Sequence, residues 1–274
     1  RQRLLLTPPH HRWEQISLPL ELWPLRLDLL HCPDFIPPFR RPCPAVITVH
    51  DLAFIRFPET ITPESHRYYG QVRRAVESAQ AIIAVSEATK ADIVELLGAD
   101  PARIRVIYEA ADERFRPLDR EAVGRFLEDK GLPRDYILWV STIEPRKNLA
   151  TLLRALALLR DQDRGRPLVA VGEPGWLYQD TLRLVEKLGM GNLVIFYGSA
   201  SLNELHYLYN GACLFAFPSL YEGFGLPPVE AMACGIPVVA ANTSSLPEVL
   251  GEAALYVAPN DAEGLAQAIA RVAE

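Results

Sequence analysis

Short apolar runs alternate with helical segments along most of this 274-residue chain. The runs have the length of strands and fall at 27–31, 45–50, 81–85, 104–108, 136–140, 168–171, 193–197, 213–217, 237–241 and 254–257. Segments with helical spacing separate them, at 63–80, 87–97, 121–130, 149–160, 178–188, 202–211, 228–234 and 262–272. Because strands that alternate with helices form parallel sheets, the pattern predicts an α/β fold. Residues 1–25 show no clear period and are predicted to be mostly irregular.

Residues 109–117 interrupt the alternation, since they follow neither period and contain charges and a proline. We place a domain boundary there and predict domains at 1–115 and 116–274. The second domain has a full Rossmann-like set of elements, whereas the first lacks the opening strands and the glycine loop of a matching domain. The chain also begins with Arg1 and ends inside an expected helix. We therefore expect two Rossmann-like domains, the first truncated at its N-terminus.

Composition narrows the classes of partner. The net charge of −6 disfavours nucleic acid, because proteins that bind phosphate backbones carry a basic face. No apolar run reaches the length of a membrane-spanning helix, and the run at 4–6 is too short for a signal peptide. The cysteines lack Cys-x-x-Cys spacing, so we expect free thiols in a reducing cytoplasm. They are Cys32, Cys43, Cys213 and Cys234.

The segment 217–235 has the form of a strand end, a glycine loop and a helix start. Gly223 and Gly225 are expected to take positive φ angles, and Gly235 is placed to end the helix, whose first turn holds two prolines. Free N–H groups at such a corner suit a phosphate or a sugar hydroxyl. Glu222 in the loop and Glu230 in the expected first turn can reach two parts of one ligand. A carboxylate in a first turn can also simply complement the helix dipole.

A second polar segment, at 141–149, follows the strand expected at 136–140. Asn148 is expected to cap the next helix, whose buried stripe is Leu149, Leu152, Leu153 and Leu156. Arg146 and Lys147 then lie beside a helix N-terminus, where two cations and free N–H groups suit a diphosphate. The alternative is a solvated pair of cations. The position after a strand, facing the ligand-binding edge of a sheet, favours the diphosphate site.

In the N-terminal part, His50 ends the strand expected at 45–50, at the edge where open α/β sheets bind ligands. A single histidine in such a place is also commonly structural, and its charge state does not follow from sequence. Two possible metal motifs are rejected: Asp161-Gln162-Asp163 follows a helix rather than a strand, and His10-His11 is too local to bind an ion. No metal site is expected.

Glu222 and Glu230, with Gly-Phe-Gly-Leu-Pro between them at 223–227, resemble the Glu-x7-Glu signature of a large family of retaining glycosyltransferases, the group 1 or family 4 type. Pro-Ser at 218–219, Glu-Ala-Met-Ala at 230–233 and Gly-Ile-Pro-Val at 235–238 also fit its pattern. The segment from His50 to 58 and the second domain look most like bacterial mannosyltransferases of polysaccharide assembly. The resemblance implies a GT-B fold with two Rossmann-like domains.

The resemblance also implies roles for single residues. Arg146 and Lys147 would hold the donor's diphosphate, and Glu222 would contact sugar hydroxyls near the reacting carbon. Glu230 would accept hydrogen bonds from the ribose, and His50 would meet the transferred sugar, facing Glu222 across the interdomain cleft. Further donor contacts would come from Gly223, Phe224, Gly225, Leu226 and Ser141. Ser141 stands where the family commonly has Gly, and Glu109-Ala110 where it often has Asn-Gly.

These roles imply transfer of a hexose from a nucleoside-diphosphate sugar to a saccharide or lipid-linked acceptor, with GDP-mannose favoured and neither cofactor nor metal needed. Two alternatives stay open: a non-hydrolysing sugar-nucleotide epimerase and a non-catalytic nucleotide-sugar-binding fragment. We expect a cytoplasmic protein, and a location at the inner face of the membrane is compatible with a lipid-linked acceptor. There the arginines of the helix at 63–80 could contact anionic lipid. These arginines are Arg67, Arg73 and Arg74. The alternative is that they form a solvated face of the helix.

Overall fold

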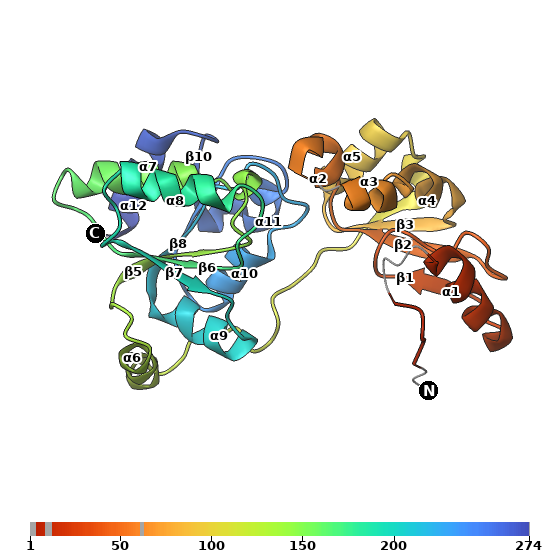
Figure 1. Ribbon diagram of the computed structural model, residues 1–274, viewed down its shortest axis with the longest axis horizontal. Helices are drawn as coiled ribbons and strands as arrows, with labels where there is room; N and C mark the ends of the chain where they lie inside the picture. Colours follow the sequence, from red (N-terminus) through yellow and green to blue (C-terminus); the bar gives the residue numbers. More distant parts are fainter. Residues whose placement is uncertain (1–3, 9–12, 61–62, 274) are drawn as a thin grey trace. The chain divides into compact units, whose positions relative to one another are not determined.

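The structure, a computed structural model, describes residues 4–8, 13–60 and 63–273. It divides into two compact units, unit 1 (Arg1–Tyr108) and unit 2 (Glu109–Glu274). Unit 1 and unit 2 are the right-hand and left-hand parts of Figure 1. The division falls before the segment 109–117, which belongs to unit 2.

Unit 1 is built on a four-stranded parallel sheet in the order β1-β2-β3-β4. The strands are β1 (Leu30–Cys32), β2 (Ala45–Val49), β3 (Ala81–Ala84) and β4 (Ile104–Val106). The helices are α1 (Glu14–Leu22), α2 (Ala53–Arg56), α3 (Pro63–Tyr69), α4 (Val72–Ser78) and α5 (Glu87–Leu97). Ser86 caps α5 by accepting a hydrogen bond from the Thr89 N–H, as the sequence predicts. From β2 onward the strands of this unit alternate with helices, as expected, whereas β1 and β2 follow each other with no helix between them.

The prediction that residues 1–25 are mostly irregular is wrong for its second half, where α1 is followed by a 3-10 turn at Trp23–Leu25. Its apolar residues point to two sides: Leu22 packs into unit 1, whereas Ile16 and Leu20 are exposed. With apolar side chains on both sides of the helix, the usual amphipathic period disappears. Pro19 inside the helix also argues against a helix when the sequence alone is considered. The single helix expected at 63–80 is also divided, into α3 and α4, with Gly70 at the junction.

Unit 2 contains a six-stranded parallel sheet in the order β10-β9-β8-β5-β6-β7. The strands are β5 (Tyr136–Val140), β6 (Leu168–Val171), β7 (Val194–Gly198), β8 (Ala212–Phe217), β9 (Val238–Ala241) and β10 (Ala254–Val257). β5 pairs with both β6 and β8, so the strand order reverses there. In doubly wound sheets the loops after two such strands diverge and leave a ligand-binding crevice at their carboxyl ends.

Helices cover both faces of this sheet (Figure 1). They are α6 (Arg120–Asp129), α7 (Leu149–Arg160), α8 (Tyr178–Lys187), α9 (Leu202–Gly211), α10 (Leu226–Ala233), α11 (Leu246–Leu250) and α12 (Ala262–Ala273). Side chains of β5 alternate between the two cores: Trp139 packs with the stripe of α7, and Tyr136 packs on the face of α9. The stripe expected on α7 is confirmed, since its four leucines are at most 2% exposed. This packing fixes the carboxyl ends of β5 and β8.

The four cysteines are free thiols, as expected. In the described residues, no helix combines the length and the apolar character that crossing a membrane requires.

Candidate functional site

The candidate site lies where the loops after β5 and β8 meet. Arg146 and Lys147 occupy a 3-10 turn, Pro145–Lys147, between β5 and α7. The backbone carbonyl of Arg146 accepts hydrogen bonds from the Leu220 N–H, at 2.8 Å, and from the Ser219 hydroxyl, at 3.3 Å. These bonds tie the turn to the loop after β8. The structure therefore brings the Arg-Lys pair to the same sheet edge as the glycine loop.

Asn148 joins the two loops as well, but in a different way from the one expected. Its backbone is left-handed, with φ 55°, and its side chain makes no capping bond to α7. The side-chain amide instead donates to the Pro218 carbonyl at 3.0 Å, and its oxygen accepts from the Thr151 hydroxyl. Asn148 therefore occupies the predicted N-cap position of α7, but its side chain holds the loop after β8 instead of capping the helix.

An ion cluster forms at this junction. Lys147 Nζ lies 2.7 Å from Oε1 and 2.9 Å from Oε2 of Glu222, while Arg146 Nη1 lies 3.8 Å from Glu222 Oε2. Arg146 also pairs with Glu144 at 2.9 Å and donates to the Tyr221 carbonyl. The side chains of Arg146, Lys147 and Glu222 are only 9–13% exposed. Two cations thus face two carboxylates in a largely buried environment, where their charges interact more strongly than in water.

A group of hydroxyls after β9 braces the Glu222 loop. Ser244 Oγ accepts from the Glu222 N–H at 2.9 Å. The buried Ser245 hydroxyl lies 3.0 Å from the carbonyls of both Glu222 and Phe224. Thr243 contacts the Leu220 carbonyl. Sequence reasoning missed this Thr-Ser-Ser triplet, although its place directly after an expected strand was a usable signal.

The glycine loop differs from expectation in two details. Gly225 has φ 97° and Gly235 has φ 77° after the end of α10, as predicted. Gly223 is not among the described glycines with positive φ, so that prediction is wrong. Helix α10 begins at Leu226, which places Glu230 in its second turn rather than its first. The two prolines lie in the first turn and start the helix earlier than the sequence pattern suggested.

Glu230 lies apart from the ion cluster, and in the described part of the chain it forms no ion pair. Its Oε2 accepts a hydrogen bond of 2.8 Å from the hydroxyl of Tyr209 on α9. Burial raises the pKa of Glu230, the bond from Tyr209 lowers it, and the charge of Asp112 raises it. Burial likewise raises the pKa of Tyr209 well above its usual value, so this hydroxyl stays protonated. The structure thus separates Glu222 and Glu230 into two different environments.

Ser141 follows β5, and its N–H donates to the Val171 carbonyl at 3.0 Å. Its own carbonyl packs on Gly172, where an added Cβ would lie 1.8 Å from that oxygen. Gly175 also lies against this loop, with its N–H bonded to the Ile143 carbonyl. The Gly-Glu-Pro-Gly run at 172–175 was missed from sequence, although two glycines directly after a strand indicate close backbone approach.

His50 belongs to unit 1, where it directly follows β2 and is exposed. Its Nε2 lies 2.8 Å from the Pro33 carbonyl. The neighbouring Asp51 accepts from the Ala53 N–H and so caps α2. His50 thus lies at the carboxyl end of β2, where open α/β sheets bind ligands.

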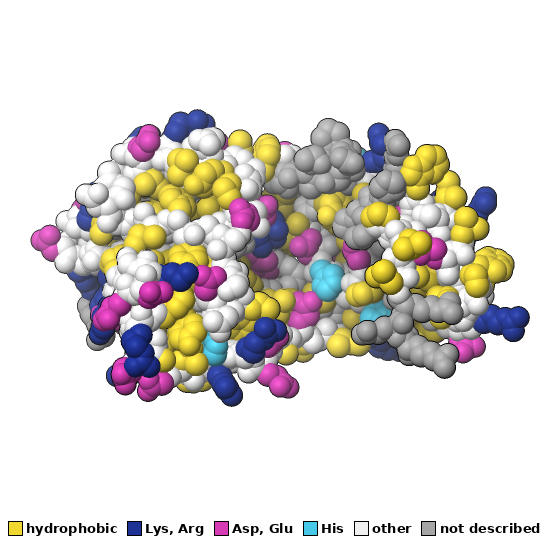
Figure 2. Space-filling view, turned by 60° about the horizontal axis from the view of Figure 1, so that its bottom comes forward, with side chains coloured by type: hydrophobic (Ala, Val, Ile, Leu, Met, Phe, Trp, Pro, Cys, Tyr) yellow, Lys and Arg dark blue, Asp and Glu magenta, His cyan; other side chains and the backbone are white. Residues whose placement is uncertain are grey.

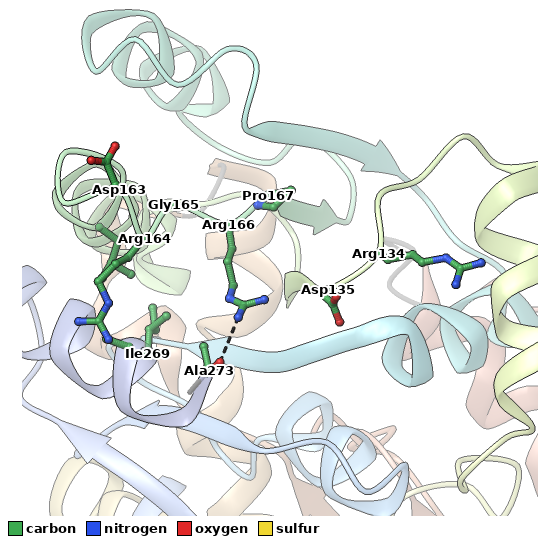
Figure 3. Close-up of a pocket in the computed structure, with 11 residues that line it drawn as sticks. Arg134, Asp135, Asp163, Arg164, Gly165, Arg166, Pro167, Ile269 and Ala273 are labelled. Carbon is green, nitrogen blue, oxygen red and sulfur yellow. Dashed lines mark hydrogen bonds between the residues drawn. The ribbon is translucent and has the colours of Figure 1, made fainter.

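A cavity of about 400 Å³ lies at the opposite edge of the unit 2 sheet (Figure 3). It is lined by residues that precede β5 and β6 and by the end of α12, among them Arg134, Asp135 and Arg166. Arg166 donates to the Ala273 carbonyl and so holds the last turn of α12. Because ligands of such sheets bind at the carboxyl ends, this cavity at the amino ends is a different feature from the candidate site.

Of the two motifs set aside as metal sites, the structure describes Asp161-Gln162-Asp163. Asp161 pairs with Arg160 at 2.6 Å on the exit of α7, while His10-His11 lies outside the described residues. Across the described ranges, no group of three or more potential metal ligands is present.

Two of the three arginines considered for contact with lipid make contacts within unit 1. Arg73 donates to the carbonyls of Leu96 and Leu97 and closes the end of α5. The Arg74 guanidinium lies 4.0 Å above the ring of Phe39.

Comparisons with known proteins agree with the sequence resemblance. A family model described as glycosyl transferases group 1 matches residues 123–274, and one described as glycosyltransferase family 4 matches residues 3–115. The chain is 36% identical over 240 residues to O-antigen chain mannosyltransferase B of Escherichia coli. That match covers 86% of this chain and 63% of the relative, so the chain spans less than two thirds of its length.

Solved structures give the same fold. Sucrose-phosphate synthase from Thermosynechococcus elongatus superposes with a TM-score of 0.79 at 23% identity, covering 97% of this chain and 70% of that one. Anabaena HepE in complex with UDP-glucose superposes with a TM-score of 0.76 at 24% identity, covering 96% and 77%. The expected GT-B type of fold, with two Rossmann-like units and parallel sheets, is confirmed.

Proposed function

Because this chain belongs to the group 1 glycosyltransferases, we propose that it transfers a hexose from a nucleoside-diphosphate sugar to a saccharide or lipid-linked acceptor. The sugar is mannose and the favoured donor is GDP-mannose, since similar proteins are named mannosyltransferases. The transfer retains the configuration of the anomeric carbon. The acceptor oxygen bonds to that carbon as its bond to the phosphate oxygen breaks, and the acceptor's proton passes to the departing phosphate.

One observation carries this proposal: Arg146, Lys147 and Glu222 meet at the carboxyl edge of the sheet, between β5 and β8. A diphosphate is a stronger partner for two cations than a single carboxylate, because it offers more negative oxygens. In the proposed donor complex it binds Arg146 and Lys147, while Glu222 turns to the sugar hydroxyls. The two cations then stabilise the negative charge of the leaving nucleotide, which is the dominant electrostatic contribution in transfer reactions. Neither metal nor cofactor takes part.

The remaining residues complete the proposed donor site. Glu230 accepts hydrogen bonds from the ribose, and His50 contacts the transferred sugar. Backbone groups at 223–226 hold the sugar or the phosphates, and the Ser141 side chain adds a further contact to the donor. The left-handed Gly225, with φ 97°, gives the loop the sharp turn that this approach requires.

Product analysis tests the proposal. The protein is incubated with GDP-mannose, UDP-glucose or ADP-glucose, each with and without a mannoside acceptor, and the products are identified by mass spectrometry and NMR. The expected result is an α-linked product from GDP-mannose that forms only when acceptor is present. Interconversion of the nucleotide sugar without acceptor would establish the epimerase instead. Nucleotide binding with no product in either condition would establish a binding protein.

Contact with the cytoplasmic face of a membrane is a further part of the proposal. Unit 1 has 13 Lys and Arg against 12 Asp and Glu, whereas unit 2 has 15 against 22. Unit 1 is thus close to neutral and unit 2 is acidic, so an anionic surface repels unit 1 less than unit 2. Trp13, Ile16, Leu20 and Trp23 are 53–71% exposed and follow helical spacing on α1 and its ends. Figure 2 shows hydrophobic side chains at the surface of unit 1.

Vesicle binding tests this contact. Trp13→Ser with Trp23→Ser is expected to reduce co-sedimentation with phosphatidylglycerol vesicles severalfold, since exposed tryptophans prefer the membrane interface. Exposed Trp176 of unit 2 serves as the control, and Trp176→Ser is expected to change nothing. Equal binding of all three proteins, or self-association of the wild type through these tryptophans without vesicle binding, would refute the contact.

A further inference from the structure

We propose that Tyr209 is a positioning residue of the donor site, whose hydroxyl fixes the Glu230 carboxylate for recognition of the ribose hydroxyls. The inference rests on the proposed function, in which Glu230 binds the ribose. It adds a residue that belongs to no expected motif and that lies on another helix. Tyr209 comes from α9, whereas Glu230 comes from α10.

The ring of Tyr209 is held rigidly. It is fully buried and lies between Phe115, at 5.5 Å with the planes 88° apart, and Phe215, at 5.6 Å and 58°. A side chain packed on two sides by aromatic rings keeps one rotamer. Its hydroxyl is therefore a fixed point, and the 2.8 Å bond to Oε2 fixes the Glu230 carboxylate in turn. In the described residues, no other hydrogen bond to that carboxylate is present.

A carboxylate fixed in this way is matched to a ribose. Its two oxygens have about four lone-pair positions, and Tyr209 occupies one of them. The others can accept the two hydroxyl protons of a vicinal diol. Because the terminal torsion of Glu is soft, removing the hydroxyl frees the carboxylate to turn. The geometry thus gives Tyr209 a role through Glu230 and no contact of its own with the ligand.

The ionisable groups around Glu230 make the Tyr209 hydrogen bond important for keeping the carboxylate ionised. The ionisable groups that affect this pair are Asp112 from the segment before α6 and Cys234 at the end of α10. Asp112 raises the pKa of Glu230, as burial does, and the Tyr209 bond opposes both. Without the hydroxyl, the Glu230 pKa moves further up. The ionised carboxylate that accepts ribose protons is then lost at a higher pH as the solution is acidified.

Binding of GDP and of 2′,3′-dideoxy-GDP, together with UDP and its dideoxy form, tests the inference by titration calorimetry. Tyr209→Phe is expected to weaken binding of the ribose-containing nucleotide about three- to tenfold, the size of the net contribution of one ordinary hydrogen bond, because the lost bond acts on the ligand only through Glu230. The dideoxy nucleotide should lose less than twofold. In Tyr209→Phe, the pH below which affinity for the ribose-containing nucleotide falls should also be higher than in the wild type. In the Glu230→Gln background, the same change should have no further effect.

The same helix offers a matched control. Tyr207 lies two residues away, stacks on Phe126 at 4.8 Å, and makes no contact with Glu230. Tyr207→Phe is therefore expected to leave both affinities unchanged. The unfolding temperature without ligand shows whether the Tyr209→Phe variant remains folded. If that variant does not fold, Glu230→Gln alone should reproduce the selective loss of affinity for the ribose-containing nucleotide.

The outcomes separate this inference from the proposed function. If the wild type binds GDP or UDP and Tyr209→Phe weakens the ribose and dideoxy forms equally, the positioning role is refuted while the donor site stands. Equal binding of both forms by the wild type would refute the role of Glu230 together with that of Tyr209. If no nucleotide binds the wild type, the proposed function fails and this inference with it.

Discussion

Lys147 Nζ lies within 3 Å of both carboxylate oxygens of Glu222, and this contact joins the loop after β5 to the loop after β8. The residues are 75 positions apart in the chain. They meet because β5 and β8 are neighbours in the sheet, although two strands and three α-helices lie between them in sequence. Parallel neighbours end at the same edge, so their following loops share one place. The contact is therefore a direct consequence of the strand order.

Replacing Lys147 by Ala is expected to remove most of the nucleotide binding. A cation that contacts a diphosphate contributes about 1.5–3 kcal/mol, so affinity for GDP or UDP should fall at least tenfold. The stabilisation that ligand gives in a thermal shift should shrink accordingly. Lys187→Ala, at an exposed position in the last turn of α8, makes the same charge change and should have no effect. Undiminished binding by Lys147→Ala would place the diphosphate elsewhere.

Glu222→Gln is expected to separate binding from transfer. Glu222 neutralises Lys147 in the structure, so a diphosphate must displace it. The neutral amide competes less well for the ammonium group, and affinity for inorganic pyrophosphate should rise severalfold. Transfer should fall by about two orders of magnitude, because the charge near the reacting carbon is lost. The measurements are pyrophosphate titration and initial transfer rates. A fall in pyrophosphate affinity would contradict this reading of the pair.

Much of the fold follows from the sequence because the strands are short apolar runs, and the central ones are buried on both faces. Runs such as 136–140 and 254–257 are continuous and apolar, and the structure ends these strands at the same residues. Helix α1 was missed because it carries apolar residues on an exposed side as well as a buried one. A period can be read only where one face is polar. The break between α3 and α4 escaped detection because one glycine interrupts an otherwise continuous pattern.

The site was predictable as far as its residues follow strands. Arg146, Lys147 and Glu222 all lie directly after predicted strands, and the sheet brings them together. Tyr209 was not predictable in this way, since it lies inside a helix and reads as a core residue. The side-chain role of Asn148 was also beyond sequence reasoning. Its partner Pro218 comes from a loop 70 residues away, and the left-handed backbone that presents the amide depends on that packing.

Gly225→Ala is expected to destabilise unit 2 by about 1–3 kcal/mol. The position has φ 97°, which L-residues rarely adopt, and an added Cβ would lie 2.7 Å from Leu246 Cδ2. Gly191→Ala is the matched control, since nothing lies within 4 Å of its added Cβ and its φ is not positive. Urea denaturation measures both. Equal midpoints for the two variants would show that the turn at Gly225 tolerates a side chain.

Stability is expected to fall as the pH drops below about 4.5, and Glu204 is one cause. The Lys130 ammonium, followed by Ser201 and then Tyr197, lowers the Glu204 pKa from 4.5 to about 2. A group whose pKa is lowered by folding stabilises the fold above its unfolded pKa and loses that effect as pH falls towards the folded value. The window is therefore pH 4.5 to 2. Urea denaturation between pH 6 and 3 should show a smaller acid loss for Glu204→Gln than for the wild type. Glu263→Gln, at an exposed position in the first turn of α12, should retain the wild-type slope. Identical slopes for all three proteins would remove Glu204 as a source of the acid sensitivity.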